Sequence, residues 1–366
     1  MKILWINHRD LKHPHAGGAE VRLYEIARRL VKMGHEVTVL CENVNGLPSE
    51  EVLDGIKIKR MGNKISIHVL APLYVKKHGH EYNVIIDDIA HAVPWYSPLV
   101  TKTPVIAQVH HVHQDVVHIE LPKPLAWIVS RAERTITKVY KHFIAVSQST
   151  KEELVKRFNI NPNRVTVVPN GVDLEKYKPG SKDQRPTILW IGRIKKYKNL
   201  DHLLKAYKIA KQKISDAQLI IIGTGDQEQE MKKLARELEL RDVYFLGKVS
   251  EEEKIRWMQR TWIIVSTSTI EGWGMVVTEA ATCRTPAIAY NVPGLRDFVK
   301  HMETGILVKL GNIEQLAKTI TWLLTDDNLR NRLAENAYRY VQQFSWDRVA
   351  EDFLEVIQSD VQWNYR

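Results

Sequence analysis

The sequence contains little cysteine and no long apolar run. Cys41 and Cys283 are the only cysteines in 366 residues, and neither has ligand-like neighbours. This argues against a disulfide framework or a cysteine zinc site and fits a reducing cytoplasm. No run of 18 apolar residues occurs, and the first seven residues turn polar too early for a signal peptide. These absences predict a soluble, cytoplasmic protein.

The patterns of nucleic-acid-binding modules are also absent. The chain has no helix-turn-helix, zinc-finger or RNP-like aromatic motif, so nucleic acid is the weakest candidate partner. Its charge is nevertheless uneven, because residues 1–172 carry 23 Lys and Arg against 16 Asp and Glu, together with 13 of the 15 histidines. A basic, histidine-rich first half favours an anionic partner such as a phosphorylated ligand or an acidic membrane surface, although a solvated surface accounts for most such charges.

Length and hydrophobic pattern predict an α/β fold with two domains. A chain of 366 residues exceeds one ordinary core and fits two domains of about 150 to 200 residues each. Short β-branched runs alternate with amphipathic segments, which is typical of parallel sheets covered by helices on both faces. We therefore predict two Rossmann-like domains facing across a cleft, residues 1–172 and 173–345, with the polar stretch 169–186 as the linker. The predicted strands are 2–7, 37–40, 57–59, 84–86, 105–109, 143–146 and 165–168, then 187–191, 218–222, 243–245, 262–265, 286–289 and 305–308.

The stretch from Trp262 to Ala280 combines a buried strand, a polar loop and the start of a helix. The loop is rich in Ser, Thr and Gly, which leaves backbone N–H groups bare at the N-terminus of a helix predicted over 275–283, where an anion is favoured. Glu271 precedes this helix and Glu279 lies inside it. We interpret Glu279 as an acceptor for a vicinal diol and Glu271 as an acceptor for the hydroxyls of a second sugar. Two solvated glutamates on a surface helix are the alternative.

Two cations follow the strand at 187–191. Arg193 lies at the strand end and Lys198 opens the next helix, so both side chains can reach the mouth of a cleft. Together they form a candidate clamp for a diphosphate, the Arg by bidentate geometry and the Lys as a point charge. A solvated basic loop is the alternative, since four cations fall within residues 193–198.

Two further patterns resemble a dinucleotide-binding turn and a zinc site, but each lacks residues that such a site needs. Gly223-Thr224-Gly225 follows a strand, but Glu228 stands where a dinucleotide-binding turn needs its third glycine, so nicotinamide binding is set aside. Three histidines within residues 110–113 end another strand and invite a zinc site. Asp115 is the only carboxylate or cysteine close to them in sequence. This favours histidines that line the core or a cleft over histidines that bind a metal.

These motifs and their order resemble the retaining nucleotide-sugar glycosyltransferases of family 4, or glycosyl transferases group 1. The resemblance runs from about residue 2 to 358. It implies the GT-B fold of two Rossmann-like domains, with a C-terminal helix, about 346–366, that returns to the first domain. One departure is segment 293–297, where relatives often show paired glycines and a glutamate. The matching motifs are Gly17-Gly18-Ala19-Glu20, Asn170-Gly171-Val172-Asp173, Gly192-Arg193 with Lys198-Asn199, and Glu271-Gly272-x-Gly274 with Glu279.

The resemblance also implies roles for individual residues. Glu279 would bind the ribose of the donor and Glu271 the transferred sugar, with His110 beside that sugar. Arg193 and Lys198 would bind the diphosphate. The implied catalytic residues are Glu271, His110, Arg193 and Lys198. The implied donor-binding residues are Gly17, Gly18, Arg193, Lys198, Gly223, Lys248, Val249, Glu271, Gly272, Trp273, Gly274, Met275, Val276 and Glu279.

We expect no metal and no separate cofactor. The sequence has no Asp-x-Asp motif, and Asp87 and Asp88 are adjacent, so they point to opposite faces of an extended segment. Protein cations and a helix N-terminus can instead stabilise a leaving nucleoside diphosphate. The resemblance implies a UDP- or GDP-sugar as donor and a glycan, lipid-linked or small-molecule hydroxyl as acceptor. A nucleotide-sugar epimerase or hydrolase, or a catalytically silent binding module, stays open, as does the oligomeric state.

Residues 121–142 combine apolar and basic side chains. Leu125, Trp127 and Ile128 lie close in sequence to Arg131 and Lys138, a combination typical of helices that rest on anionic lipid. This predicts an acceptor presented at the inner face of the cell membrane. The alternative is a helix packed on the sheet with its basic side solvated.

Overall fold

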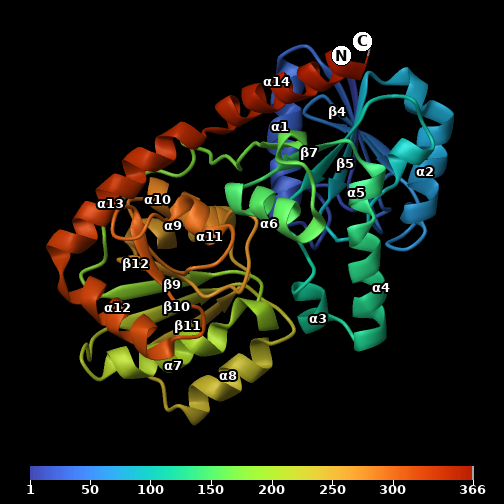
Figure 1. Cartoon of the computed structure of the whole chain (residues 1–366). Helices are drawn as coiled ribbons and strands as arrows, with labels where there is room; N and C mark the ends of the chain where they lie inside the picture. The colour runs from blue at the N-terminus through green and yellow to red at the C-terminus, as the bar shows by residue number, and fades with distance from the viewer. Residues whose placement is uncertain (365–366) are drawn as a thin grey trace. The chain divides into compact units, whose positions relative to one another are not determined.

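The computed structural model describes residues 1–364, which form two compact units (Figure 1). Unit 1 comprises Met1–Gly171 and the C-terminal helix that begins at Trp346, and unit 2 comprises Val172–Ser345. Each unit contains a largely parallel sheet flanked by helices, which confirms the predicted α/β class with two Rossmann-like domains.

The sheet of unit 1 has eight strands in the order β3-β4-β2-β1-β5-β6-β7-β8. All neighbours are parallel except β3 and β4, and the sequence prediction missed β3 because its four residues include two glutamates and lie at the edge. The strands on either side of β1 are reached in opposite directions, which places a topological switch point between β1 and β5. The strands are β1 Lys2–Ile6, β2 Glu36–Cys41, β3 Glu50–Leu53, β4 Ile56–Arg60, β5 Val84–Ile89, β6 Val105–Val109, β7 His142–Ala145 and β8 Val165–Val167.

Helix α1 of unit 1 shows why these segments become helical. It begins after Gly17, whose N–H donates to Glu20 Oε2 at 2.7 Å, and it buries Leu23, Ile26 and Leu30 at a spacing of three and four residues. The helices of unit 1 are α1 Gly18–Lys32, α2 Ile67–His78, α3 Val116–Glu120, α4 Lys123–Arg134, α5 Ile136–Val139, α6 Gln148–Phe158 and α14 Trp346–Asn364.

The C-terminal helix α14 packs on unit 1, as predicted. Phe353 stacks on Trp5 of β1 with ring centroids 4.9 Å apart and planes inclined by 5°. Near its start, Asp347 accepts from Arg29 Nε of α1 at 2.6 Å. None of the helices described within residues 1–364 is long and apolar enough to span a membrane.

Unit 2 contains a fully parallel six-stranded sheet in the order β11-β10-β9-β12-β13-β14. Its switch point lies between β9 and β12. The strands are β9 Thr187–Ile191, β10 Gln218–Ile222, β11 Val243–Gly247, β12 Ile263–Ser266, β13 Ala287–Tyr290 and β14 Gly305–Val308. The helices are α7 Leu200–Lys211, α8 Glu228–Glu237, α9 Glu251–Arg260, α10 Met275–Thr282, α11 Leu295–Phe298, α12 Ile313–Thr325 and α13 Asp327–Val341.

The polar stretch predicted as a linker is mostly part of unit 2. Tyr177 is buried in the core of that unit, and Lys182 donates to the Cys283 carbonyl at 3.2 Å. The linker prediction was therefore wrong from Val172 onward, because isolated buried residues among polar neighbours gave no periodic signal. Gly171 packs against Trp346, where a Cβ would lie 2.6 Å from the indole ring.

A cluster of aromatic rings fills the switch point of unit 1. His8, directly beyond β1, lies with its ring centroid 4.7 Å from those of His68 and His91 and 4.8 Å from that of Trp95. Burial, followed by the nearby charges of His68 and Arg9, lowers the pKa of His8 to about 3. The folded protein therefore holds this imidazole neutral.

The neutral His8 makes the stability of unit 1 depend on pH. In the unfolded chain His8 takes up a proton as the pH falls through about 6.5, whereas the folded chain resists protonation until about 3, so stability is lost across that window. We expect His8→Phe to remove about 2 kcal/mol of the decrease in unfolding free energy between pH 7 and pH 5. Urea titrations at both pH values measure this. His118→Phe, at an exposed position of α3, is the control; an equal change in both variants would contradict the assignment.

Candidate functional site

The loop after β12 enters α10 with a row of unsatisfied backbone donors. Gly274, directly before α10, has a φ of 79°, and a Cβ there would lie 2.7 Å from Leu295 Cδ2, so both conformation and space require glycine. The N–H groups of Gly272 to Val276 donate to no acceptor in the described part of the chain. Because first-turn donors and the helix dipole favour negative charge, this end of α10 suits a phosphate.

Two predicted site residues from separate motifs form one ion pair. The Lys198 ammonium contacts Glu271 Oε1, and Ser268 Oγ donates to the same oxygen at 2.7 Å. The two charged side chains are only 14 % and 20 % exposed. Burial opposes the charged form of Lys198, but the charge of Glu271 outweighs it and raises the pKa of the ammonium.

Hydrogen bonds fix the turn that carries Lys198 to the loop that carries Glu271. Asn199 has a φ of 47°, and its Nδ2 donates to the Thr267 carbonyl and the Thr269 hydroxyl, both at 2.9 Å. In return, Thr267 Oγ1 donates to the Lys198 carbonyl at 2.8 Å. The ends of β9 and β12 are thus joined directly across the switch point.

Gly294 packs against the Glu271 loop from the other side. Its φ is 83°, and a Cβ would lie 2.1 Å from the Glu271 carbonyl oxygen. The Glu271 N–H donates to the Pro293 carbonyl at 3.2 Å, and the Gly294 N–H donates to Asp297 Oδ2 at 3.0 Å. Segment 293–297, which departs from the family pattern, therefore supports the Glu271 loop with one glycine and an aspartate.

Glu279 lies in a polar cluster that the sequence did not indicate. Lys254 Nζ, on α9, is 3.1 Å from Glu279 Oε2 and 2.9 Å from Glu251 Oε1, and the Tyr177 hydroxyl donates to Glu251. Burial opposes ionisation of Glu251, but Lys254 and then Tyr177 lower its pKa to about 2. The alternative of a solvated Glu279 is therefore wrong. No sequence signal connected these residues because they come from distant segments.

Arg193 has a different environment from Lys198. It is exposed and forms no ion pair within residues 1–364, although its charge acts on Lys198. Lys248 is likewise exposed after β11, whereas Val249 packs partly on the core. In the described chain, no hydrogen bond or ion pair joins Lys248 to the Lys198 and Glu271 pair.

The paired glycines after β10 are explained by close backbone packing. A Cβ on Gly223, whose φ is 128°, would lie 1.9 Å from the Gly192 carbonyl oxygen, and one on Gly225 would lie 2.1 Å from that of Ile194. Both glycines therefore let the β10 loop press against the loop after β9. This places Gly223 beside the Arg193 turn and accounts for the motif without a dinucleotide.

The Trp273 side chain belongs to the core of unit 2. Its ring packs edge-on against Phe344 at 5.1 Å and Phe298 at 6.4 Å, and it is 5 % exposed. Of Trp273, only the backbone is therefore left for the donor contact that the family resemblance implies.

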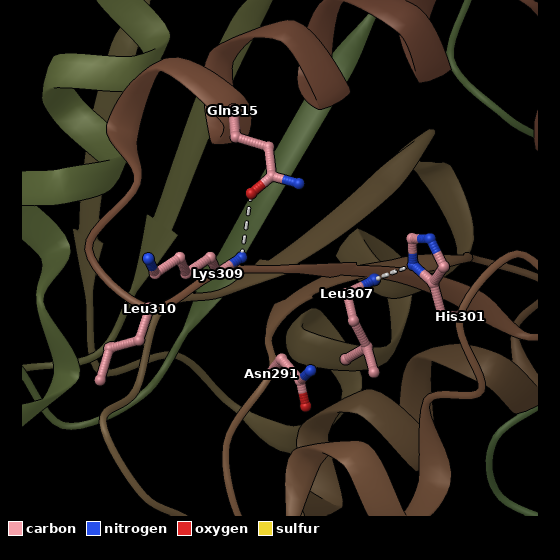
Figure 2. Close-up of a pocket in the computed structure, with 6 residues that line it drawn as sticks. All are labelled: Asn291, His301, Leu307, Lys309, Leu310 and Gln315. Carbon is pink, nitrogen blue, oxygen red and sulfur yellow. Dashed lines mark hydrogen bonds between the residues drawn. The ribbon is translucent and has the colours of Figure 1, made fainter.

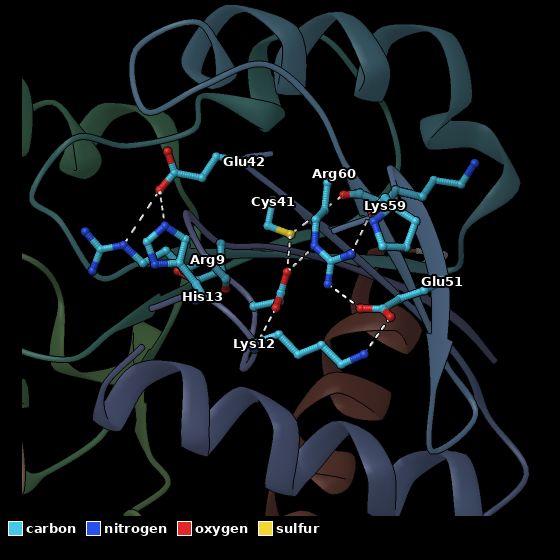
Figure 3. Close-up of polar contacts among 11 residues, drawn as sticks. Arg9, Lys12, His13, Cys41, Glu42, Glu51, Lys59 and Arg60 are labelled. Carbon is cyan, nitrogen blue, oxygen red and sulfur yellow. Dashed lines mark hydrogen bonds and ion pairs between the residues drawn. The ribbon is translucent and has the colours of Figure 1, made fainter. Parts of the chain in front are cut away.

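A charge network, buried at Arg60 and Asp10, fixes the loop between β1 and α1 in unit 1 (Figure 3). Arg60 Nε lies 2.6 Å from Asp10 Oδ2, and both side chains are almost fully buried. Lys12 Nζ contacts Glu51 at 2.7 Å, and Cys41 Sγ donates to Asp10 at 3.4 Å. The network sets the path of the loop that ends at Gly17 and Gly18, whose N–H groups open α1.

His110 lies at the carboxyl end of β6 and is held by an aspartate of the neighbouring strand. Its Nε2 is 2.7 Å from Asp88 Oδ1. Asp87 instead accepts from the Ser97 and Tyr140 hydroxyls, both at 2.7 Å, on the other face of β5. This confirms that the two aspartates point to opposite faces. The sequence prediction missed the role of Asp88 because it did not pair β5 with β6 in register.

The zinc site considered at residues 110–113 is not formed. His113 Nδ1 lies 3.1 Å from Glu133 Oε1, and its Nε2 lies 3.2 Å from the Ala90 carbonyl, so both ring nitrogens are occupied. The His111 ring packs on that of His113 with centroids 4.0 Å apart. Within residues 1–364, no group of three or more His, Cys, Asp or Glu side chains is arranged to hold a metal.

A cavity of about 540 Å³ lies at the carboxyl ends of β13 and β14 (Figure 2). The predicted donor-binding residues do not line it. Two side chains that line the cavity accept hydrogen bonds from the backbone. Gln315 accepts from the Lys309 N–H and His301 from the Leu307 N–H, each at 3.1 Å. None of the residues that line the cavity belongs to α10 or to the loop before it.

Two family models match most of the chain in tandem. The model described as Glycosyl transferases group 1 matches residues 172–340, and the model described as Glycosyltransferase Family 4 matches residues 16–176. An uncharacterised glycosyltransferase of Methanocaldococcus jannaschii is 26 % identical over 93 % of this chain and 94 % of its own length.

Solved structures show the same fold. A sucrose-phosphate synthase from Thermosynechococcus elongatus has a TM-score of 0.83 at 22 % identity, covering 98 % of both chains. HepE of Anabaena, crystallised with UDP and glucose, has a TM-score of 0.77 at 19 % identity, covering 98 % of this chain and 100 % of its own.

The Lys198 and Glu271 pair should be detectable in stability. We expect Lys198→Met to lower the unfolding free energy of unit 2 by about 1 to 3 kcal/mol, because it leaves a largely buried carboxylate without its counter-charge. Adding Glu271→Gln should recover most of that loss. Arg193→Met, which breaks no ion pair within residues 1–364, should change it by less than about 0.5 kcal/mol. Calorimetry of the full chain measures all three, and equal losses in Lys198→Met and Arg193→Met would refute the pairing.

Proposed function

The chain belongs to the glycosyl transferases of group 1 and family 4, and from this premise we propose that it transfers a sugar from a nucleoside diphosphate sugar to an acceptor hydroxyl with retention of configuration. The family membership supports glycosyl transfer. The donor, the stereochemistry and the acceptor are our proposals.

One observation carries the proposal: the N–H groups of Gly272 to Val276, which donate to no acceptor within residues 1–364, open α10 directly after Glu271, whose partner is Lys198. This arrangement is preorganised for an anion at the carboxyl edge of a parallel sheet. HepE binds UDP and glucose, so a UDP-sugar is the first donor to test, with GDP-sugars next.

The proposed chemistry uses protein charges in place of a metal. As the glycosidic bond breaks, negative charge grows on the diphosphate, and Arg193, Lys198 and the α10 N-terminus would stabilise it. Glu279, oriented by Lys254, would accept hydrogen bonds from the ribose, and Glu271 from the transferred sugar. Because Glu271 holds Lys198, the pair would align the sugar and phosphate contacts together.

Loss of Arg193 should reduce transfer without affecting folding. We expect Arg193→Ala to lower kcat/KM by about 10²-fold, because it removes a donor to the developing charge, while the unfolding temperature stays unchanged. Lys195→Ala is the matched control, since Lys195 in the same loop already pairs with Asp226. Steady-state transfer from a UDP-sugar measures both. A loss below about threefold would remove Arg193 from the site, and rapid donor turnover without any acceptor would favour the hydrolase or epimerase alternative.

Chelation should leave transfer intact. The proposed stabilisation comes from residues of the chain, so excess EDTA should change kcat by less than about twofold at saturating donor. Loss of activity in EDTA that Mg²⁺ or Mn²⁺ restores would refute the metal-independent mechanism.

We further propose that the acceptor is presented at an anionic membrane surface. Leu125, Trp127 and Ile128 on α4 are 47–61 % exposed, while only Ala126 and Glu133 of that helix are buried. The alternative that α4 packs its apolar side on the sheet is therefore wrong for these three residues. The Arg131 guanidinium lies 5.3 Å from the Trp127 ring centre, so apolar and basic groups share one exposed face.

A second apolar stripe lies on α2 and just before it. Ile65, Val69 and Leu73 follow one another at four-residue spacing and are 56–82 % exposed. Exposed Lys64 and Lys76 accompany them. Figure 1 shows α2 and α4 on the same flank of the unit 1 sheet. Apolar side chains among cations suit an anionic bilayer.

Vesicle sedimentation tests this surface. The full chain should co-sediment with phosphatidylglycerol vesicles at low salt, dissociate as salt rises, and remain free of phosphatidylcholine vesicles. The double variant Trp127→Ser, Ile128→Ser should weaken binding about tenfold or more, whereas Val52→Ser, at an exposed apolar position of β3, should not. Equal binding to both vesicle types, or to neither, would favour an acceptor free in solution.

A further inference from the structure

We infer that Asp88 is a positioning residue for His110, and that Gln108 and Arg22 hold Asp88 in place from the core of unit 1. The inference rests on the proposed function only in taking His110 to lie beside the transferred sugar, the place that the family resemblance implies for it. The contacts that carry it lie entirely within unit 1.

Asp88 accepts hydrogen bonds from three side chains of adjacent strands. His110 Nε2 is 2.7 Å from its Oδ1, while Gln108 Nε2 at 2.7 Å and Trp5 Nε1 at 3.0 Å donate to its Oδ2. Asp88 and Gln108 are paired in register across β5 and β6, so their side chains share one face of the sheet. Trp5 is itself fixed by its stack on Phe353. Every donor to the carboxylate is thus held by the sheet or by α14.

The geometry selects one tautomer of His110. An ionised carboxylate only accepts hydrogen bonds, so His110 Nε2 must carry the proton. In the neutral imidazole Nδ1 is then the unprotonated nitrogen, and it has no partner within residues 1–364. A partner that fixes one ring nitrogen decides what the other nitrogen offers a ligand.

Arg22 provides the charge that balances Asp88. Its Nε donates to Gln108 Oε1 at 3.0 Å, and its Nη1 donates to the Pro169 carbonyl at 2.7 Å and to Asn170 Oδ1 at 2.9 Å. Asp88, Gln108 and Arg22 are fully buried, and a buried charge without a counter-charge would be costly. Gln108 can connect the two charges because its amide has both a donor and an acceptor end. The contacts therefore run from His110 through Asp88, Gln108 and Arg22. They end at Pro169 and Asn170, just before the boundary with unit 2.

Asp87 supplies a matched control. It is the adjacent residue in the same strand and is equally buried, but it accepts from Ser97 and Tyr140 on the opposite face. Asp87→Asn removes a buried carboxylate of the same size without touching the contacts of His110. A general loss of stability would therefore appear in both variants, and a positioning effect only in Asp88→Asn.

The experiment is ¹⁵N NMR of the full chain labelled at histidine, with the His110 signals assigned from His110→Asn. In the parent protein, His110 should be a single Nε2–H tautomer, and a dominant Nδ1–H tautomer would overturn the inference without any variant. In Asp88→Asn the asparagine offers both a donor and an acceptor, so the tautomer ratio should shift. Asp87→Asn should leave it unchanged. An unchanged ratio in Asp88→Asn would also overturn the inference.

Kinetics separate this inference from the proposed function. Asp88→Asn should lower kcat by about 10- to 100-fold with donor KM within about threefold, and in a His110→Asn background it should cause little further loss. Additive losses would show that Asp88 acts independently of His110 and would contradict the inference. If the tautomer shifts as expected but His110→Asn remains fully active, Asp88 positions His110 and the role proposed for His110 in transfer is wrong.

Discussion

A parallel sheet brings the carboxyl ends of all its strands to one edge, where polar side chains collect against a buried core. In both units the switch point leaves this edge open between two central strands. Charged groups that lie there at low exposure must be paired to avoid a large desolvation cost. The Lys198 and Glu271 pair in unit 2 follows from this constraint, and so does the placing of Arg22, which balances Asp88 through Gln108 in unit 1.

The two units satisfy the constraint in different ways. In unit 2 the pair is direct and joins two loops, and the backbone of each loop is fixed by its own contacts, through Asn199 on one side and Gly294 on the other. In unit 1 the balancing charge is remote, because Gln108 stands between Asp88 and Arg22. Direct pairing couples the two side chains that are proposed to contact the donor. The contacts through Gln108 fix His110 by its Nε2 alone and leave its Nδ1 without a partner within residues 1–364.

The prediction of secondary structure from sequence succeeded where side-chain periodicity was strong. Every predicted strand is present, with ends shifted by at most a few residues, because most of these parallel strands are buried and consist of short apolar, β-branched runs. The prediction missed β3, an edge strand with alternating exposure and acidic residues, and it assigned residues 173–186 to a linker although Tyr177 is buried. Both segments bury at most isolated residues, and most of their neighbours in the sequence are polar. Such segments show no hydrophobic periodicity from which a strand or a core segment could be predicted. The cleft between the two domains stays a prediction.

For the site, the sequence by itself determined which residue types occupy the loops after the central strands. Gly274 and the bare α10 N-terminus follow from local composition, and so do the positions of Arg193 and Lys198 after β9. Tertiary structure alone decided the partners: Glu271 for Lys198, Lys254 for Glu279 and Asp88 for His110. The physical reason is range. Backbone conformation and helix termini are set by neighbours within a few residues, whereas a polar contact between side chains 22 to 73 residues apart exists only after the strands have paired in register.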